Sequence, residues 1–154
     1  MGVEIERKFL VRDRAVLGDV EGIPYRQGYL STKADRTVRV RRAGSHAFIT
    51  VKGRSAGATR AEFEYEIPVA DAEAMLALCI PPLIEKVRHR VAHGGRTWEV
   101  DIFGGANEGL VVAEVELPSA DAAVEMPPWV GAEVTGDPRY FNANLVTHPF
   151  RDWR

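Results

Sequence analysis

The sequence predicts a mainly antiparallel β protein (α+β), in which eight strands form a closed or nearly closed β-barrel tunnel with a charged lumen and a few helices packed outside. Two observations support this fold class. Eight segments alternate apolar with polar residues at a period of two, the pattern of strands with one apolar and one polar face. Helical segments are few and short, so they can cover the apolar face while the charged face lines the interior.

The first half of the chain holds five of the expected strands. They span residues 4–11, 25–30, 37–41, 47–52 and 62–67. Between them, residues 13–22 are expected to form a short helix or loop, 42–46 a turn and 53–60 a flexible polar loop, because these stretches are rich in glycine and polar residues.

The second half begins with the main expected helix, from Asp71 to Ile80. Its apolar residues lose the period of two, and Pro81-Pro82 stops it. The last three strands are expected at residues 85–91, 97–103 and 110–117. Gly94-Gly95 predicts a hairpin turn between the first two of these strands. Ser119 could begin a short helix that ends before Pro127, and a last helix is expected in the tail after Pro138.

Composition indicates one soluble globular domain over residues 1–154. The chain is 45% hydrophobic and 27% charged, with a net charge of −2, so no bulk attraction to nucleic acid or to an anionic membrane is expected. Cys79 is the one cysteine, which excludes an intramolecular disulfide and a cysteine-based zinc cluster. The sequence starts without the apolar run of a signal peptide and has no membrane-spanning stretch. We therefore expect a cytoplasmic protein without nucleic-acid or membrane partners. The sequence does not decide between a monomer and a homodimer.

The polar faces of the expected strands carry both signs of charge. Their basic side chains are Lys8, Arg39, Arg41, Lys52, Lys86, Arg88 and Arg90. Their acidic side chains are Glu4, Glu6, Glu62, Glu64, Glu66, Glu99, Asp101, Glu114 and Glu116. On any single strand, the simplest interpretation is that these charges face water. Repeated around a closed barrel, they would line a lumen, and uncompensated buried charge is so unfavourable that the lumen must hold water, ions and a charged ligand.

The chemistry of the two charge sets predicts the ligand. The cations match a polyanion rich in phosphate, because arginine binds phosphate oxygens bidentately. The carboxylates are hard oxygen ligands, which suit Mg²⁺ or Mn²⁺ better than zinc. Phosphate-binding cations beside metal-binding carboxylates indicate a site for phosphoanhydride chemistry.

The order of these motifs resembles the CYTH superfamily, the triphosphate tunnel metalloenzymes. Glu4-Ile5-Glu6-Arg7-Lys8 is similar to the ExExK signature of that superfamily. The later segments fit in order, and they are Gln27 to Leu30, Arg39-Val40-Arg41, Thr50 to Gly53, Glu62-Phe63-Glu64, Lys86-Val87-Arg88, Glu99-Val100-Asp101, Glu114-Val115-Glu116 and the tail from Glu133 to Tyr140. The resemblance covers nearly the whole chain and is greatest to the short bacterial inorganic triphosphatases. It implies an eight-stranded antiparallel tunnel that binds a small-molecule triphosphate with a divalent metal.

The family pattern and the charge pattern together suggest two metal ions. One ion would use Glu62 or Glu64 with Glu114 and Glu116, and the other, held by Glu4 and Glu6, would position the attacking water. The phosphate chain would be held by Lys8, Arg39, Arg41, Lys52, Lys86 and Arg88.

The sequence leaves the roles of two residues open. Asp101 is interpreted either as a further metal ligand or as a side chain that orients an arginine. Tyr29 is a catalytic candidate, since a phenol near Lys86 could help to activate water, but a packing role for this tyrosine explains its position equally well.

Three other functions compete with the hydrolysis of inorganic triphosphate. Hydrolysis of an organic triphosphate, such as thiamine triphosphate or a nucleotide, would use the same site. A class IV adenylyl cyclase would need a base-binding pocket, for which the sequence has no motif. A non-catalytic polyphosphate-binding module needs cations and at most one metal, so the presence of both Glu4 and Glu6 argues against it.

Overall fold

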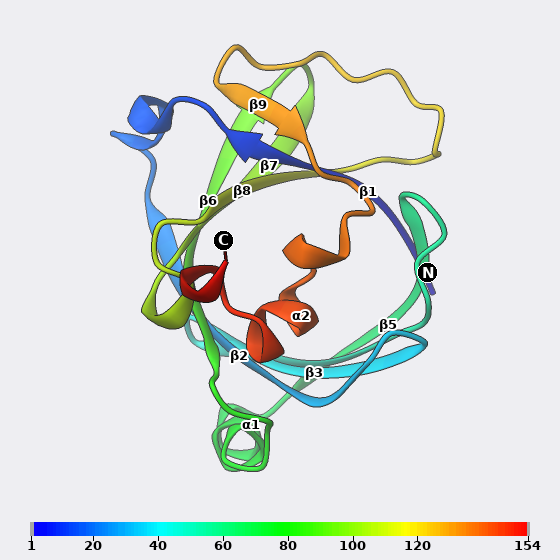
Figure 1. Ribbon diagram of the computed structural model, residues 1–154, viewed down its shortest axis with the longest axis vertical. Coiled ribbons are helices and arrows are strands. Elements are labelled where there is room, and N and C mark those ends of the chain that lie inside the picture. Colours follow the sequence, from blue (N-terminus) through cyan, green and yellow to red (C-terminus); the bar gives the residue numbers. More distant parts are fainter. Residues whose placement is uncertain (1, 154) are drawn as a thin grey trace.

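The computed structural model describes residues 2–153, which form one antiparallel sheet of nine strands curled into a ring (Figure 1). The strand order is β5-β4-β3-β2-β6-β7-β8-β1-β9, and an additional pairing of β5 with β1 closes the first eight strands into the ring. These eight strands are β1 (Val3–Val11), β2 (Gly22–Lys33), β3 (Arg36–Ala43), β4 (His46–Lys52), β5 (Thr59–Ile67), β6 (Ile84–His93), β7 (Arg96–Phe103) and β8 (Val111–Glu116). All eight predicted strands are therefore confirmed.

Strand β9 (Val130–Glu133) was not predicted from the sequence. It pairs with the end of β1, beside Phe9 and Val11. It has four residues, too few to show an alternating pattern, and it contains Gly131. A Cβ atom at Gly131 would lie 3.3 Å from the backbone oxygen of Leu10, so glycine allows strands β1 and β9 to approach closely.

Apolar side chains on the outer face of the ring are buried in two separate clusters. The helix α1 (Val69–Leu76) packs over β3 and β4 and buries Leu76 against Val40. On the opposite side, Trp98 is fully buried between Phe9 and Trp129, with ring centroids 5.6 and 5.7 Å apart. This second cluster also includes Leu17 of the short 3₁₀ helix η1 (Arg14–Leu17).

The C-terminal segment, residues 134–153, enters one end of the ring instead of packing outside it (Figure 1). It contains η3 (Pro138–Tyr140), α2 (Asn142–Thr147) and η4 (Phe150–Asp152). Leu145 is fully buried in a cluster with Tyr29, Phe103 and Val112, inward-facing residues at the same end of the ring. The expected external packing thus holds for α1, whereas α2 differs because the ring interior at this end is apolar.

The short helix expected from Ser119 to Pro127 is wrong. These residues form turns and irregular structure, and the Ser119 hydroxyl donates a hydrogen bond to the Asp121 carboxylate at 2.9 Å. A segment this short forms a helix only where tertiary packing stabilises it, as the burial of Leu76 does for α1. The η2 turn (Gly105–Asn107) joins β7 to β8. Within residues 2–153, no helix is both long enough and apolar enough to cross a membrane.

Candidate active site

The ring encloses a cavity of about 580 Å³ that is lined by side chains from all eight of its strands. The lining includes every site residue predicted from the sequence except Asp101. The period of two explains this result, because alternate residues of each antiparallel strand face the same side of the sheet. The loop after β4 and the C-terminal segment complete the lining at one end.

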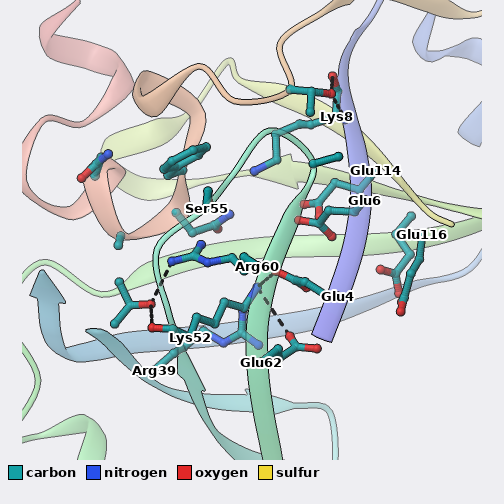
Figure 2. A pocket seen from close by; sticks show the side chains of 18 of the residues that line it. Glu4, Glu6, Lys8, Arg39, Lys52, Ser55, Arg60, Glu62, Glu114 and Glu116 are labelled. Atoms are coloured by element: carbon teal, nitrogen blue, oxygen red, sulfur yellow. Dashed lines mark hydrogen bonds and ion pairs between the residues drawn. The ribbon is translucent and has the colours of Figure 1, made fainter. Parts of the chain in front are cut away.

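Carboxylates of β1 and β8 form the acidic part of the cavity (Figure 2). Glu6 lies opposite Glu116 and Lys8 opposite Glu114 in the pairing of the two strands. Burial and the neighbouring Glu114 and Glu4 raise the pKa of Glu6 well above its ordinary value. Burial alone would also raise the pKa of Glu114, but nearby cations, Lys8 first, hold it well below its ordinary value. The nearby cations therefore offset the negative charge of Glu114 but not that of Glu6.

Lys52 of β4 partly neutralises the carboxylates of β1 and β5. Its ammonium lies 2.6 Å from a Glu4 oxygen and 3.5 Å from a Glu62 oxygen (Figure 2). Burial still raises the pKa of Glu4, although the contact with Lys52 opposes the shift. One lysine thus serves two carboxylates.

The donor chemistry of this region fits a divalent metal. Glu4, Glu6, Glu62, Glu114 and Glu116 provide carboxylate oxygens from three adjacent strands, and Mg²⁺ and Mn²⁺ prefer such ligands. The raised pKa values of Glu4 and Glu6 show a demand for positive charge here. Within residues 2–153, no three carboxylate, histidine or cysteine side chains lie close enough together to hold an ion as they stand. An ion at this place would require these carboxylates to move closer together.

Glu64, also predicted as a metal ligand, is hydrogen-bonded to groups of the basic part of the cavity. Its carboxylate accepts hydrogen bonds from the Thr50 hydroxyl at 2.8 Å and from the Arg39 guanidinium at 3.2 Å. Burial alone would raise the pKa of Glu64, but Thr50 and Arg39 hold it below its ordinary value. Glu64 is therefore already satisfied as the counter-ion of Arg39.

The basic part of the cavity contains more positive charge than its neighbours neutralise. The Arg41 side chain donates a hydrogen bond to Gln27 Oε1 at 3.1 Å and has no ion pair with a carboxylate among the described residues. Burial, with Arg39 and Arg88 nearby, lowers the pKa of Arg41 to about 10. The ring of Tyr25 lies between Arg41 and Arg88, 5.0 and 4.9 Å from their guanidinium carbons. Such an excess of ordered cations is suited to a multivalent anion.

Asp101 lies behind this basic wall, 1% exposed. One of its oxygens accepts a hydrogen bond from Lys86 at 2.7 Å, and both accept hydrogen bonds from Arg88 at 2.8 Å. Burial alone would raise the pKa of Asp101, but the two cations hold it at about 2. The carboxylate does not line the cavity, so its geometry favours the orienting role over metal ligation.

Lys86 should make the stability of the fold pH-dependent. Burial lowers the pKa of Lys86 to about 7, against 10.5 for an ordinary lysine. Between these two values the unfolded chain binds the proton more tightly, so the contribution of Lys86 to the free energy of unfolding rises with pH. Urea denaturation at about pH 7 and about pH 10 should show a larger gain for the natural chain than for Lys86→Met. Equal gains for the two proteins would contradict the shift.

Tyr29 and Lys86 have separate hydrogen-bond partners. The Tyr29 hydroxyl oxygen accepts a hydrogen bond from Gln27 Nε2 at 3.3 Å, whereas Lys86 donates to Asp101 and to Asn142. Across residues 2–153, no hydrogen bond joins the tyrosine to the lysine directly. Both line the cavity, so the predicted cooperation would have to act through substrate or water.

Several lining residues were missed by the sequence analysis. Arg60 was assigned to the flexible loop, yet β5 already begins at Thr59 and places Arg60 opposite Glu4 (Figure 2). The spacing of Arg60 from Glu62 and Glu64 was the available signal, since it continues their period of two. Phe141 and Asn142 line the cavity from the C-terminal segment, and no local pattern indicates this position.

Known proteins are similar to the chain over nearly its whole length. A family model described as CYTH domain matches residues 2–149. An inorganic triphosphatase of Acetivibrio thermocellus is 50% identical over 155 residues, covering 100% of this chain and 99% of that protein. An inorganic triphosphatase of Nitrosomonas europaea is 40% identical over 147 residues, covering 93% and 96%. The crystal structure of an inorganic triphosphatase has a TM-score of 0.65 and 37% identity, with 95% of each chain covered.

Proposed function

We propose, from the premise that this chain belongs to the CYTH domain family, that it hydrolyses inorganic triphosphate to phosphate and pyrophosphate with the help of a divalent metal. The observation that carries the proposal is one cavity with an excess of cations on one part and an excess of carboxylates on another. The relatives named inorganic triphosphatase support the choice of substrate.

The cations of the cavity would bind the phosphate chain. Arg39, Arg41 and Arg88 present planar guanidinium groups, which match pairs of phosphate oxygens, and Lys8, Lys52 and Lys86 add point charges. These groups also neutralise charge that develops on the pyrophosphate as the bond between phosphorus and the bridging oxygen breaks. Asp101 holds Lys86 and Arg88 in place for this task.

The carboxylates would hold Mg²⁺ or Mn²⁺, and we propose two ions. Glu4 and Glu6 would bind one, and Glu114 and Glu116 with Glu62 or Glu64 would bind the other. Bound metal supplies charge neutralisation and lowers the pKa of a coordinated water. Tyr29 is proposed to orient the attacking water, because its oxygen already accepts a hydrogen bond from Gln27 and its hydroxyl hydrogen is left to donate.

Phosphate release should be highest with inorganic triphosphate and should stop on removal of metal. The test compares inorganic triphosphate, ATP and thiamine triphosphate, each with Mg²⁺, Mn²⁺ or EDTA. Preference for an organic substrate would retain the site but assign it to an organic triphosphatase. Activity that survives EDTA would contradict the metal proposal. Tight triphosphate binding without hydrolysis would identify a binding module instead.

Arg41→Ala should weaken substrate binding without destabilising the fold. The loss of a charged donor to phosphate should raise KM for triphosphate about 10- to 100-fold. Stability should stay within about 1 kcal/mol, because Arg41 is a half-buried cation without a carboxylate partner among the described residues, so its removal takes away an unpaired charge together with one hydrogen bond to Gln27. Arg26→Ala is the matched control, since Arg26 lies on the outer face of β2 and pairs with Glu73 at 3.1 Å. An unchanged KM in Arg41→Ala would exclude its role as a phosphate ligand.

A further inference from the structure

Asn142, the first residue of α2, joins the C-terminal segment to the basic part of the cavity. Its Oδ1 atom lies 3.2 Å from Gln27 Nε2 and 3.4 Å from Lys86 Nζ. Gln27 is fully buried, and its own Oε1 atom accepts a hydrogen bond from Arg41 at 3.1 Å. One chain of hydrogen bonds therefore runs from Arg41 through Gln27 to Asn142, where it meets Lys86.

The chemistry of the two cations fixes the direction of every hydrogen bond in this chain. A guanidinium has no acceptor, so Gln27 must turn its oxygen to Arg41 and its amide nitrogen towards Asn142. The amide nitrogen of Gln27 can only donate, so Asn142 must present its oxygen to Gln27, and Lys86 donates to the same oxygen. Both neighbours thus require Oδ1 at the same position, and the orientation of the Asn142 amide is determined.

The amide nitrogen of Asn142 consequently remains available. Its side chain lines the cavity, and Nδ2 has no hydrogen-bond partner within residues 2–153. A neighbouring contact of the same segment is similar to that between Asn142 and Lys86, because the backbone oxygen of Tyr140 accepts a hydrogen bond from Lys8 at 3.1 Å. The segment thus uses oxygens to hold two lysines and leaves the Asn142 Nδ2 group, on a side chain that lines the cavity, without a partner in the part of the chain that the structure describes.

We propose that Asn142 is a substrate-binding residue whose Nδ2 atom donates a hydrogen bond to a phosphate oxygen held by Lys86. The inference rests on the proposed function, and it assigns to the C-terminal segment a direct part in triphosphate recognition. Gln27 is then a positioning residue, because it touches Asn142 and Arg41 and does not itself line the cavity.

Two substitutions of Asn142 separate substrate binding from a purely structural role. Asn142→Asp keeps the acceptor for Gln27 and Lys86 but replaces the N–H donor with an anionic oxygen. Asn142→Leu removes donor and acceptor without adding charge. If Asn142 only supported Gln27 and Lys86, the aspartate variant would be the milder of the two in melting temperature, and its weaker binding would come from charge repulsion alone and would therefore fade at high ionic strength. If Asn142 binds phosphate, the aspartate variant is at least as stable as the natural protein but binds substrate worst.

The experiment measures KM and kcat for inorganic triphosphate with Mg²⁺, triphosphate binding by calorimetry with EDTA, and the melting temperature. We expect Asn142→Asp to weaken binding by about 10- to 100-fold, more than Asn142→Leu, with an unchanged or higher melting temperature. Thr147→Asp adds the same charge at an exposed position of α2 and should bind normally.

The outcomes for this inference and for the proposed function are distinguishable. Natural protein that binds triphosphate but does not hydrolyse it would refute the hydrolase proposal, while the ranking of the variants would still test Asn142. Normal binding by Asn142→Asp would overturn the role of Asn142 alone. Absence of triphosphate binding by the natural protein would overturn both.

Discussion

Glu6→Gln is expected to lower turnover at least about 100-fold while the protein stays folded and becomes no less stable. Glutamine has the shape of glutamate but cannot supply an anionic oxygen to a metal ion. The same change removes one of the mutually repelling carboxylates around Glu114 and Glu4. A loss of activity combined with retained or increased stability is typical of a residue kept for function at the expense of the fold.

The direction of the stability change follows from the raised pKa of Glu6. Because the folded chain binds this proton more tightly than the unfolded chain, ionisation of Glu6 destabilises the fold as the pH rises above 4.5. Glutamine cannot ionise, so its advantage should be present at neutral pH and absent in acid. Thermal melting at several pH values, in EDTA, measures this difference.

Glu133→Gln is the matched control for Glu6→Gln. Glu133 is exposed on the outer face and forms an ion pair with Arg7 at 2.7 Å, so its loss should change stability by less than about 1 kcal/mol and leave turnover unchanged. Titration of Mg²⁺ with each variant separates metal affinity from the chemical step. Full activity of Glu6→Gln at ordinary Mg²⁺ concentrations would refute the proposed metal site.

Local sequence patterns were sufficient to predict the eight strands and most of the lining, whereas closure of the ring by β1 and β5 was implied by the resemblance to the CYTH superfamily. A period of two is a property of each strand alone, so Glu4, Glu6 and Lys8 can be assigned to one face without knowledge of their neighbours. The tail could not be placed in this way. Lys8 is bonded to Tyr140 across 132 positions, and Gln27 to Asn142 across 115 positions. Contacts at such separations depend on the tertiary fold, and no pattern within the tail records them.

The role of Asp101 was left open by the sequence for a related reason. In its strand, Asp101 alternates in the same way as Glu99, and Glu99 does line the cavity. Both carboxylates meet two cations of the opposite strand, Lys86 and Arg88 for Asp101 and Arg88 and Arg90 for Glu99. The difference is burial, because the Asp101 side chain is 2% exposed and that of Glu99 is 32% exposed. Alternation within one strand gives the face of a side chain but not its depth.

Asp101→Ala is accordingly expected to destabilise the protein by about 3–5 kcal/mol, because it leaves Lys86 and Arg88 buried without their shared carboxylate. Inorganic triphosphate would supply the missing negative charge, so it should raise the melting temperature of this variant more than that of the natural protein. Asp101→Asn, which keeps the shape, should show a smaller loss. Asp121→Ala, at an exposed carboxylate, should show almost none.

Chemical denaturation of these variants, with and without triphosphate, decides between the two roles of Asp101. An orienting residue predicts a large loss of stability in EDTA, where no metal can contribute. A metal ligand predicts the reverse, namely near-normal stability in EDTA and a raised Mg²⁺ requirement for turnover. Both Asp101 oxygens already accept hydrogen bonds from cations at 2.7–2.8 Å, and a metal ion could bind only by displacing Lys86 or Arg88. That displacement would remove a cation from the phosphate-binding part of the cavity, so metal ligation by Asp101 would work against substrate binding.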